Sequence, residues 1–154
     1  DPAQALWSKV MKNNCIFCAI AAGEIPSFKV YEDDVVLAYL DINPFTKGHV
    51  LVIPKEHTEG LLDTPDATLA AVIARVKKVA AHIKEALPCD GFNILQNNGE
   101  AAGQTVMHIH FHIVPRYGKT SVYHLSRSEK QQIGEQLYRQ YHLPEAQIRR
   151  CLAM

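Results

Sequence analysis

The chain has 154 residues, of which 47% are hydrophobic and 21% charged, values that are typical of one soluble globular domain and not of a disordered or fibrous protein. Sixteen basic residues balance sixteen acidic ones, so the net charge gives no reason to expect a nucleic acid or membrane partner. No apolar run reaches the roughly 18 residues of a spanning helix, and the amino terminus lacks a signal-peptide pattern. We therefore expect a cytoplasmic protein.

The first part of the chain predicts a peripheral arm, a short helix and three strands. The helix ends before Gly23, since glycine is favoured just past a helix end. The first two strands flank Glu32-Asp33-Asp34 and form a hairpin, and Pro54 ends the third strand. The expected elements are the arm at 1–13, the helix at 15–22, and strands at 28–31, 35–40 and 49–53.

A long helix follows. Thr64-Pro65-Asp66 has the marks of a helix start, with a capping hydroxyl, proline at the first helical position and an acid in the first turn. From Leu69 to Leu87, apolar residues recur at steps of three and four, which places them on one face. Pro88 ends this pattern.

The second part of the chain predicts two more strands and a carboxy-terminal helix. We expect strands at 92–95 and 106–114, separated by a polar loop at 96–103. Beyond Tyr117, Ser126-x-x-Glu129 resembles a capping box, and the helix that follows is limited by Pro144. Most gaps between strands are too short for parallel crossovers, so we predict an α+β fold with an antiparallel sheet and helices packed on one face.

Three histidines alternate with apolar residues in the last predicted strand. Alternate side chains of a strand leave the same face, so His108, His110 and His112 should share one face of the sheet. Two chemistries follow: His110 acts as a nucleophile, or all three rings bind a catalytic zinc. The loop at 97–105 offers amide, hydroxyl and backbone donors that suit a phosphate, which favours the nucleophile.

A second group is Cys15-x-x-Cys18, which in a reducing compartment suggests metal or redox chemistry. A structural zinc site needs two more ligands, and His57 and His108 are the candidates. The alternatives are two buried thiols without a metal, or a redox pair.

The motifs together resemble those of the histidine-triad (HIT) family, and within it the Hint-like branch. The triad segment Gly103–Arg116 carries the pattern His-φ-His-φ-His-φ-φ, where φ is apolar. The resemblance extends from about Cys15 to Tyr117, through Tyr39-Leu40-Asp41-Ile42 and the segment Gly48–Lys55. It implies a HIT domain at 14–117, with a sheet of about five strands, a long helix and a short helix. Residues 118–154 would be a helical extension packed on or beside this domain.

The resemblance implies a nucleotide hydrolase that acts at the α-phosphate of nucleoside phosphoramidates, such as adenosine monophosphoramidate, or of related nucleotidyl conjugates. In this family the middle histidine becomes transiently nucleotidylated and the third aids departure of the leaving group. The family's positions map onto this chain as follows: catalytic His110, His112 and the supporting His49; phosphate-binding Asn97, Gln104 and Thr105; ribose-binding Asp41; base-pocket Phe17, Ile20, Tyr39 and Ile42; and zinc ligands Cys15, Cys18, His57 and His108.

The family also implies one structural zinc per chain, no organic cofactor, a purine nucleotide ligand, and a homodimer in which two sheets join with the long helix at the interface. Two departures stand out: the tail after Tyr117 is longer than in Hint proteins, and Thr105 stands where serine is common. His112 argues against the transferase branch, which has glutamine there. The alternatives are a dinucleoside polyphosphate hydrolase and a non-catalytic nucleotide-binding or interaction protein.

Overall fold

The computed structural model describes residues 14–118 and, beyond them, the single positions 131–132, 135, 138–139, 142, 144 and 146. Its elements are the helices α2 (Ile16–Ala21) and α3 (Asp66–Ala86), the short 3₁₀ helix η1 (Glu100–Ala102), and the strands β1 (Lys29–Glu32), β2 (Val36–Leu40), β3 (Val50–Pro54), β4 (Gly91–Leu95) and β5 (Phe111–Arg116).

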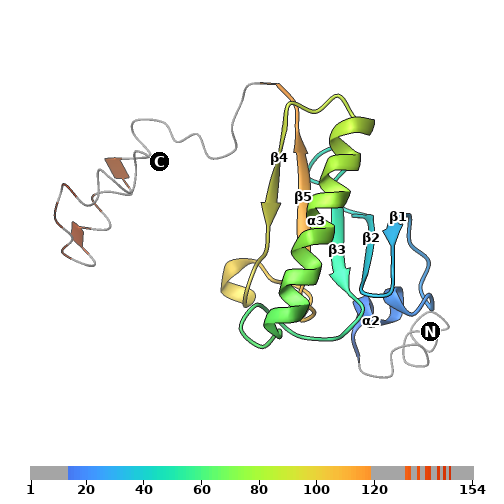
Figure 1. Ribbon diagram of the computed structural model, residues 1–154. Coiled ribbons are helices and arrows are strands. Elements are labelled where there is room, and N and C mark those ends of the chain that lie inside the picture. The colour runs from blue at the N-terminus through green and yellow to red at the C-terminus, as the bar shows by residue number, and fades with distance from the viewer. Residues whose placement is uncertain are drawn as a thin grey trace, which may run out of the picture. The chain divides into compact units, whose positions relative to one another are not determined.

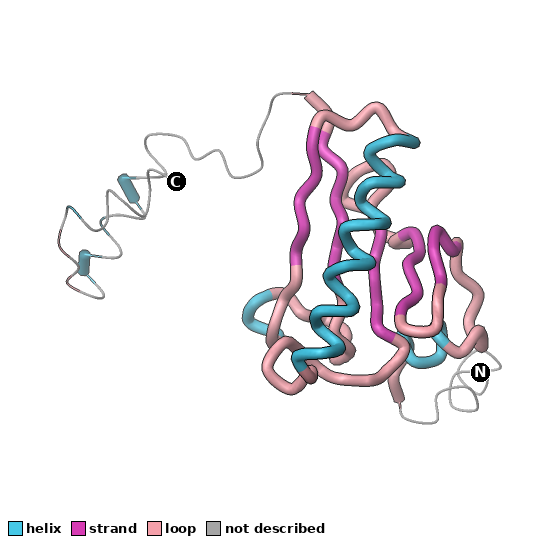
Figure 2. The backbone as a smooth tube through the Cα atoms, viewed as in Figure 1, coloured by secondary structure: helices cyan, strands magenta, loops and turns pink. Residues whose placement is uncertain are grey.

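The five strands form one antiparallel sheet in the order β1-β2-β3-β5-β4. The long helix α3 connects β3 to β4, and β1 and β4 form the two outer edges of the sheet (Figures 1 and 2). The predicted α+β class, the five-stranded antiparallel sheet, the long helix and the short helix are confirmed.

Each face of the sheet has its own core. Val50 and Val52 of β3 pack with α3, whereas Leu51 and Ile53 pack with α2 on the opposite face. Alternate residues of one strand leave opposite faces, which is why β3 is buried along its whole length. The prediction that the helices pack on one face is wrong, because both faces of the central strands are apolar and each needs a cover.

The strand predicted at 106–114 is also shorter at its start. β5 begins at Phe111, and its pairing with β3 ends at the pair Val52 and Phe111. The alternation nevertheless continues upstream, since Ile109 and Phe111 lie in the core under α3 while His112 pairs with Leu51 on the other face. The alternation of faces is therefore as predicted, although residues 108–110 form no ladder hydrogen bonds with β3.

The start of α3 is built differently from the prediction. Thr64 does not cap the helix; its hydroxyl pairs with the Thr58 hydroxyl at 2.6 Å and donates to the carbonyl of Gly60 at 2.6 Å. Pro65 occupies the N-cap position instead. Thr64 therefore anchors the loop after β3, which carries His57.

The amino-terminal arm lies outside the described residues, as does nearly all of the predicted carboxy-terminal helix. The domain boundaries given above stay predictions. Among the residues that the structure describes, no helix is long and apolar enough to cross a membrane.

The turn between β1 and β2 depends on Asp33. Its carboxylate accepts hydrogen bonds from the N–H groups of Val35 and Val36, the Tyr31 hydroxyl and Arg75 Nε of α3, at 2.7 to 2.9 Å. Asp33→Ala removes all four bonds, so we expect a loss of about 2 kcal/mol in the free energy of unfolding, measured by urea denaturation. The exposed neighbour Asp34 is the matched control, and equal losses in Asp33→Ala and Asp34→Ala would contradict this role.

Candidate functional site

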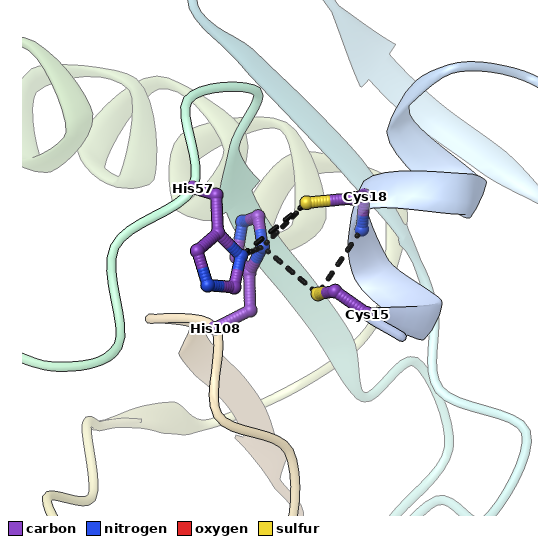
Figure 3. Close-up of side chains that lie close together, drawn as sticks. All are labelled: Cys15, Cys18, His57 and His108. Atoms are coloured by element: carbon purple, nitrogen blue, oxygen red, sulfur yellow. Dashed lines mark hydrogen bonds between the residues drawn. The ribbon is translucent and has the colours of Figure 1, made fainter. Parts of the chain in front are cut away.

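A four-residue cluster joins three separate parts of the chain (Figure 3). Cys15 and Cys18 lie at the start of α2, His57 lies in the loop after β3, and His108 precedes β5. Their ligand atoms all lie within 4.8 Å of one another. The predicted ligand set is thus brought together in space.

The distances in this cluster fit a tetrahedral zinc ion. The thiol-to-imidazole distances are 3.4 Å from Cys15 Sγ and 3.5 Å from Cys18 Sγ to His108 Nδ1, and 3.3 Å from Cys18 Sγ to His57 Nδ1. The two Nδ1 atoms are 3.2 Å apart. Bond lengths of about 2.3 Å to sulfur and 2.0 Å to nitrogen would place two nitrogen ligands of a tetrahedral ion about 3.3 Å apart, and a nitrogen and a sulfur ligand about 3.5 Å apart. The donor set and its spacing therefore fit the metal.

The tautomer of His108 also suits a ligand. Its Nε2 lies 2.8 Å from the carbonyl oxygen of Pro54 and donates to it. The neutral ring then carries its single proton on Nε2, which leaves the lone pair of Nδ1 facing the two sulfur atoms. Burial raises the pKa of Cys15, so its thiol would release a proton on binding a metal.

His110 is held differently. Its Nδ1 donates to the backbone carbonyl of His108 at 2.7 Å, and its ring packs edge-on against Phe17 with centroids 5.0 Å apart. The proton is therefore on Nδ1, and the lone pair is on Nε2. Burial lowers the pKa of His110, so the ring is neutral near pH 7. A neutral imidazole with a fixed tautomer is what a nitrogen nucleophile requires.

The third triad histidine is oriented by a chain of hydrogen bonds. The backbone N–H of Phe45 donates to His49 Nδ1 at 3.1 Å, which places the proton of neutral His49 on Nε2. His49 Nε2 lies 2.9 Å from His112 Nδ1 and donates to it. His112 must then carry its own proton on Nε2, so it presents an N–H donor at the other side of the ring.

Asp41, His49 and His112 form a second group of three candidate metal ligands. Asp41 Oδ2 is 3.6 Å from His49 Nε2, and Asp41 Oδ1 accepts the N–H of Asn43. His49 Nε2 carries a proton and donates a hydrogen bond to His112, so it has no lone pair for a metal. We therefore interpret this group as a hydrogen-bonded set and not as a cation site. Among the described residues the three triad rings do not form one ligand set, which speaks against a catalytic zinc held by all three.

Three buried histidines, His49, His108 and His110, and the half-buried His112 have lowered pKa values, which makes stability sensitive to mild acid. Burial, together with His110 and His49, lowers the pKa of His112 to about 4, and burial lowers that of His49. Because unfolded imidazoles bind protons below about pH 6.5 and the folded ones do not, stability is complete above that pH and falls as the pH decreases.

We expect His112 alone to account for a loss of about 2 kcal/mol in the free energy of unfolding between pH 7.5 and 5. Guanidinium denaturation at the two pH values measures it. His112→Asn, which cannot titrate, should show a smaller difference, and an equal difference would contradict the assignment.

The loop before the triad is closed on itself. The N–H groups of Gly99, Ala102, Gly103 and Gln104 all bond within the loop. The Gln104 side chain is buried, and its Nε2 donates to the carbonyls of Glu59 and Val106. A direct contact of Gln104 with a phosphate would need one of these bonds to break. The side chain of Asn97 lies next to Gly103, and the φ of +90° at Gly103 favours glycine. Thr105 is exposed.

Three of the predicted base-pocket residues lie together between α2 and the sheet, Phe17 and Ile20 on α2 and Tyr39 on β2. Phe17, Ile20 and Tyr39 belong to one buried cluster, and the rings of Phe17 and Tyr39 pack edge-on. Ile42 is apart from this cluster and 84% exposed. The Tyr39 hydroxyl is buried without a hydrogen-bond partner in the described part of the chain, and burial raises its pKa.

Some residues that shape the site were not predicted. Phe45 supplies the N–H that fixes His49, and its exposed ring lies nearly parallel to that of His112, at 6.3 Å between centroids. The carbonyl oxygen of Pro54 accepts a hydrogen bond from the His108 ring, and the carbonyl oxygen of Thr58 accepts one from the N–H of Ile109. Backbone groups carry no sequence signal, and a phenylalanine in a turn is not distinctive.

Comparison with known proteins agrees with this geometry. The HIT domain family model matches residues 22–119. The adenosine 5'-monophosphoramidase hnt1 of Schizosaccharomyces pombe is 42% identical over 131 residues, covering 80% of this chain and 96% of that protein. The adenylylsulfatase HINT3 of Arabidopsis thaliana is 47% identical over 109 residues, covering 71% of this chain and 55% of that protein.

A crystal structure of a zinc-bound histidine triad family protein from Mycobacterium smegmatis matches with a TM-score of 0.67 and 50% identity, covering 70% of this chain and 78% of that one. The family model covers well over half of the chain, and the fold is the one that the sequence resemblance implied. The chain belongs to the HIT family.

Proposed function

We propose that this protein is a nucleotide hydrolase that acts at the α-phosphate of nucleoside phosphoramidates or related nucleotidyl conjugates through a covalent nucleotidyl-His110 intermediate. The observation that carries the proposal is the tautomer of His110. Its Nδ1 proton is bound by the His108 carbonyl, so the Nε2 lone pair is available for attack. The relatives hnt1 and HINT3, a monophosphoramidase and an adenylylsulfatase by name, support substrates of this kind.

The reaction has two steps. His110 Nε2 attacks the α-phosphorus, and the bond to the leaving group breaks, with the bonding pair staying on the leaving atom. His112 Nε2–H donates a hydrogen bond to the phosphoryl oxygen or the leaving atom, where negative charge develops. Water then attacks the phosphorus and loses one proton, which releases a nucleoside monophosphate and restores neutral His110. This proton balances the one that the leaving group takes up from solvent as it departs.

The nucleotide would be a purine nucleotide whose phosphate is contacted by Asn97, Thr105 and Gln104. Asp41 would bind the ribose hydroxyls, and Phe17, Ile20, Tyr39 and Ile42 would bind the base. Asp41 suits this role because its side chain is only partly buried and keeps an oxygen free of the Asn43 bond. The zinc proposed at Cys15, Cys18, His57 and His108 would be structural, one per chain, with no organic cofactor.

Steady-state assays with adenosine and guanosine phosphoramidates test this function. We expect release of the nucleoside monophosphate from at least one of them. Measurable nucleotide binding with no turnover of any would favour the non-catalytic alternative instead, and preferential cleavage of dinucleoside polyphosphates would favour the other hydrolase.

We further propose that the protein is a homodimer joined at β4 and α3. β4 is an outer strand of the sheet, and an apolar groove of about 390 Å³ runs between it and α3. The groove is lined by Ile73, Val76, Ala80, Phe92 and Ile94, of which Ile73, Phe92 and Ile94 are exposed in the single chain. A second copy would cover these side chains and continue the sheet.

Ile94→Asp should convert the dimer to a monomer, because burying its carboxylate in the interface would cost more in lost hydration than a pairing with Lys77 or Lys84, which also line the groove, would return. Light scattering after gel filtration measures the mass. Leu62→Asp is the matched control, since Leu62 is 97% exposed and lies outside the groove. A monomeric wild-type chain, or an Ile94→Asp variant that remains dimeric, would contradict this interface.

A further inference from the structure

His108 belongs to two groups. It is part of the cluster of Cys15, Cys18, His57 and His108, which we call the metal cluster, and it is the first histidine of the triad. Its side chain presents Nδ1 to the sulfur atoms of Cys15 and Cys18, as Figure 3 shows for the ring. Its backbone carbonyl accepts the Nδ1 proton of His110 at 2.7 Å. One residue thus connects the two, and a shift of its backbone would move the acceptor that fixes the tautomer of His110.

The segment that carries this carbonyl has little support from the sheet. The β3–β5 ladder ends at Phe111, so residues 108–110 lie beyond it. Their position depends on other contacts. The ring of His108 bonds to Pro54, and the N–H of Ile109 donates to the Thr58 carbonyl at 2.8 Å.

The metal cluster adds a second tie between the same two segments. His57 and Thr58 are adjacent, and so are His108 and Ile109, so the loop after β3 meets the triad segment through the paired rings and through the backbone bond. Without a cation the two Nδ1 atoms, 3.2 Å apart, cannot both present lone pairs, because the lone pairs would repel. With a cation both lone pairs are satisfied, and the loop, the helix α2 and the triad segment are held at one point.

From this geometry we infer that the ligands Cys15, Cys18 and His57 are positioning residues for the nucleophile: by fixing His108 through a bound metal, they hold the carbonyl that keeps the proton of His110 on Nδ1. The inference rests on the proposed function only in naming His110 as the nucleophile. It assigns the metal centre a role in the reaction's geometry beyond stabilising the fold.

The site is open to solvent on one side, which makes the inference testable. A hollow of about 370 Å³ beside the cluster is lined by Cys15, His57 and Thr105 among others, and His57 is itself exposed. A chelator can therefore reach the metal, and His57→Ala removes one ligand without disturbing the core. His82→Ala is the matched control, an exposed histidine on α3 outside the cluster.

The experiment records long-range proton–nitrogen NMR spectra of the full chain loaded with one equivalent of Zn²⁺, after chelation, and in the two variants. His110 is assigned by its absence in His110→Asn. In the loaded wild type and in His82→Ala we expect a single His110 tautomer with the proton on Nδ1. After chelation and in His57→Ala we expect a mixture of tautomers, with kcat 10- to 100-fold lower and KM nearly unchanged.

An unchanged His110 tautomer after chelation and in His57→Ala would overturn the inference. Loss of the whole fold on chelation, seen as collapse of the amide spectrum, would overturn it as well, because the metal would then act on the entire domain and not on His110 in particular. If the wild-type chain hydrolyses no nucleotidyl conjugate, the proposed function fails, while the tautomer comparison still decides this inference.

Discussion

His110→Gly is expected to lower turnover of a nucleoside phosphoramidate by about 10³- to 10⁵-fold, because it removes the atom that forms the bond to phosphorus. The ring of His110 is buried against Phe17 and bonded to the His108 carbonyl. Its loss leaves a small cavity but no buried polar group other than that carbonyl. Nucleotide binding should persist, since the predicted ribose and base contacts come from other residues. Single-turnover kinetics and nucleotide titration measure the two effects separately.

His82→Gln is the control for this variant, since His82 is exposed on α3, away from the triad. It should retain wild-type turnover. A His110→Gly variant with turnover near that of the wild type would rule out covalent catalysis by this residue. Loss of both binding and turnover would instead point to a damaged pocket, which circular dichroism and thermal unfolding would reveal.

His112→Ala is expected to lower kcat by about 10²- to 10³-fold, because it removes one preorganised hydrogen-bond donor at the reacting phosphate. The effect should depend on the leaving group: it should be greatest for amines that leave poorly and smallest for leaving groups that are stable as anions. The donor is supplied by a neutral ring, since the pKa of His112 is lowered to about 4 and its proton is placed on Nε2 by His49.

His112→Gln and His49→Phe separate the donor from its support. The amide of glutamine can still donate, so His112→Gln should retain more activity than His112→Ala. His49→Phe leaves His112 in place but removes the bond that sets its tautomer, so we expect a smaller loss than for His112→Ala. Equal activities of His112→Ala and the wild type on a substrate whose amine leaves poorly would contradict the donor role.

The sequence predicted the fold class, the two helices and the four residues that meet in the cluster of Cys15, Cys18, His57 and His108. Periodicity identified α3 because its buried residues, such as Val72, Val76 and Ile83, recur on one face. The cluster could be predicted because Cys15-x-x-Cys18 has a spacing typical of zinc ligands and needs two further ligands, for which His57 and His108 were the candidates.

The sequence could not show how hydrogen bonds orient the rings. Whether His110 carries its proton on Nδ1 depends on the backbone carbonyl of His108. The tautomer of His112 depends on His49, whose own tautomer is set by the backbone N–H of Phe45. Backbone donors and acceptors are the same at every residue, so only the folded chain reveals which of them meets a side chain. The two-sided core was missed for a related reason: an unbroken apolar strand such as β3 shows burial but not which helix covers each face.

Mass spectrometry of the reaction, quenched in alkaline denaturant and kept alkaline because acid hydrolyses a phosphorus–nitrogen bond, tests the central claim most directly. Protein mixed with excess adenosine phosphoramidate, quenched within the first turnover and digested, should contain one peptide carrying an added nucleoside monophosphate group, with fragmentation placing the group on His110. The adduct should be absent from His110→Gly. An adduct on His112 or on any other residue, or turnover with no adduct at early times, would contradict the account.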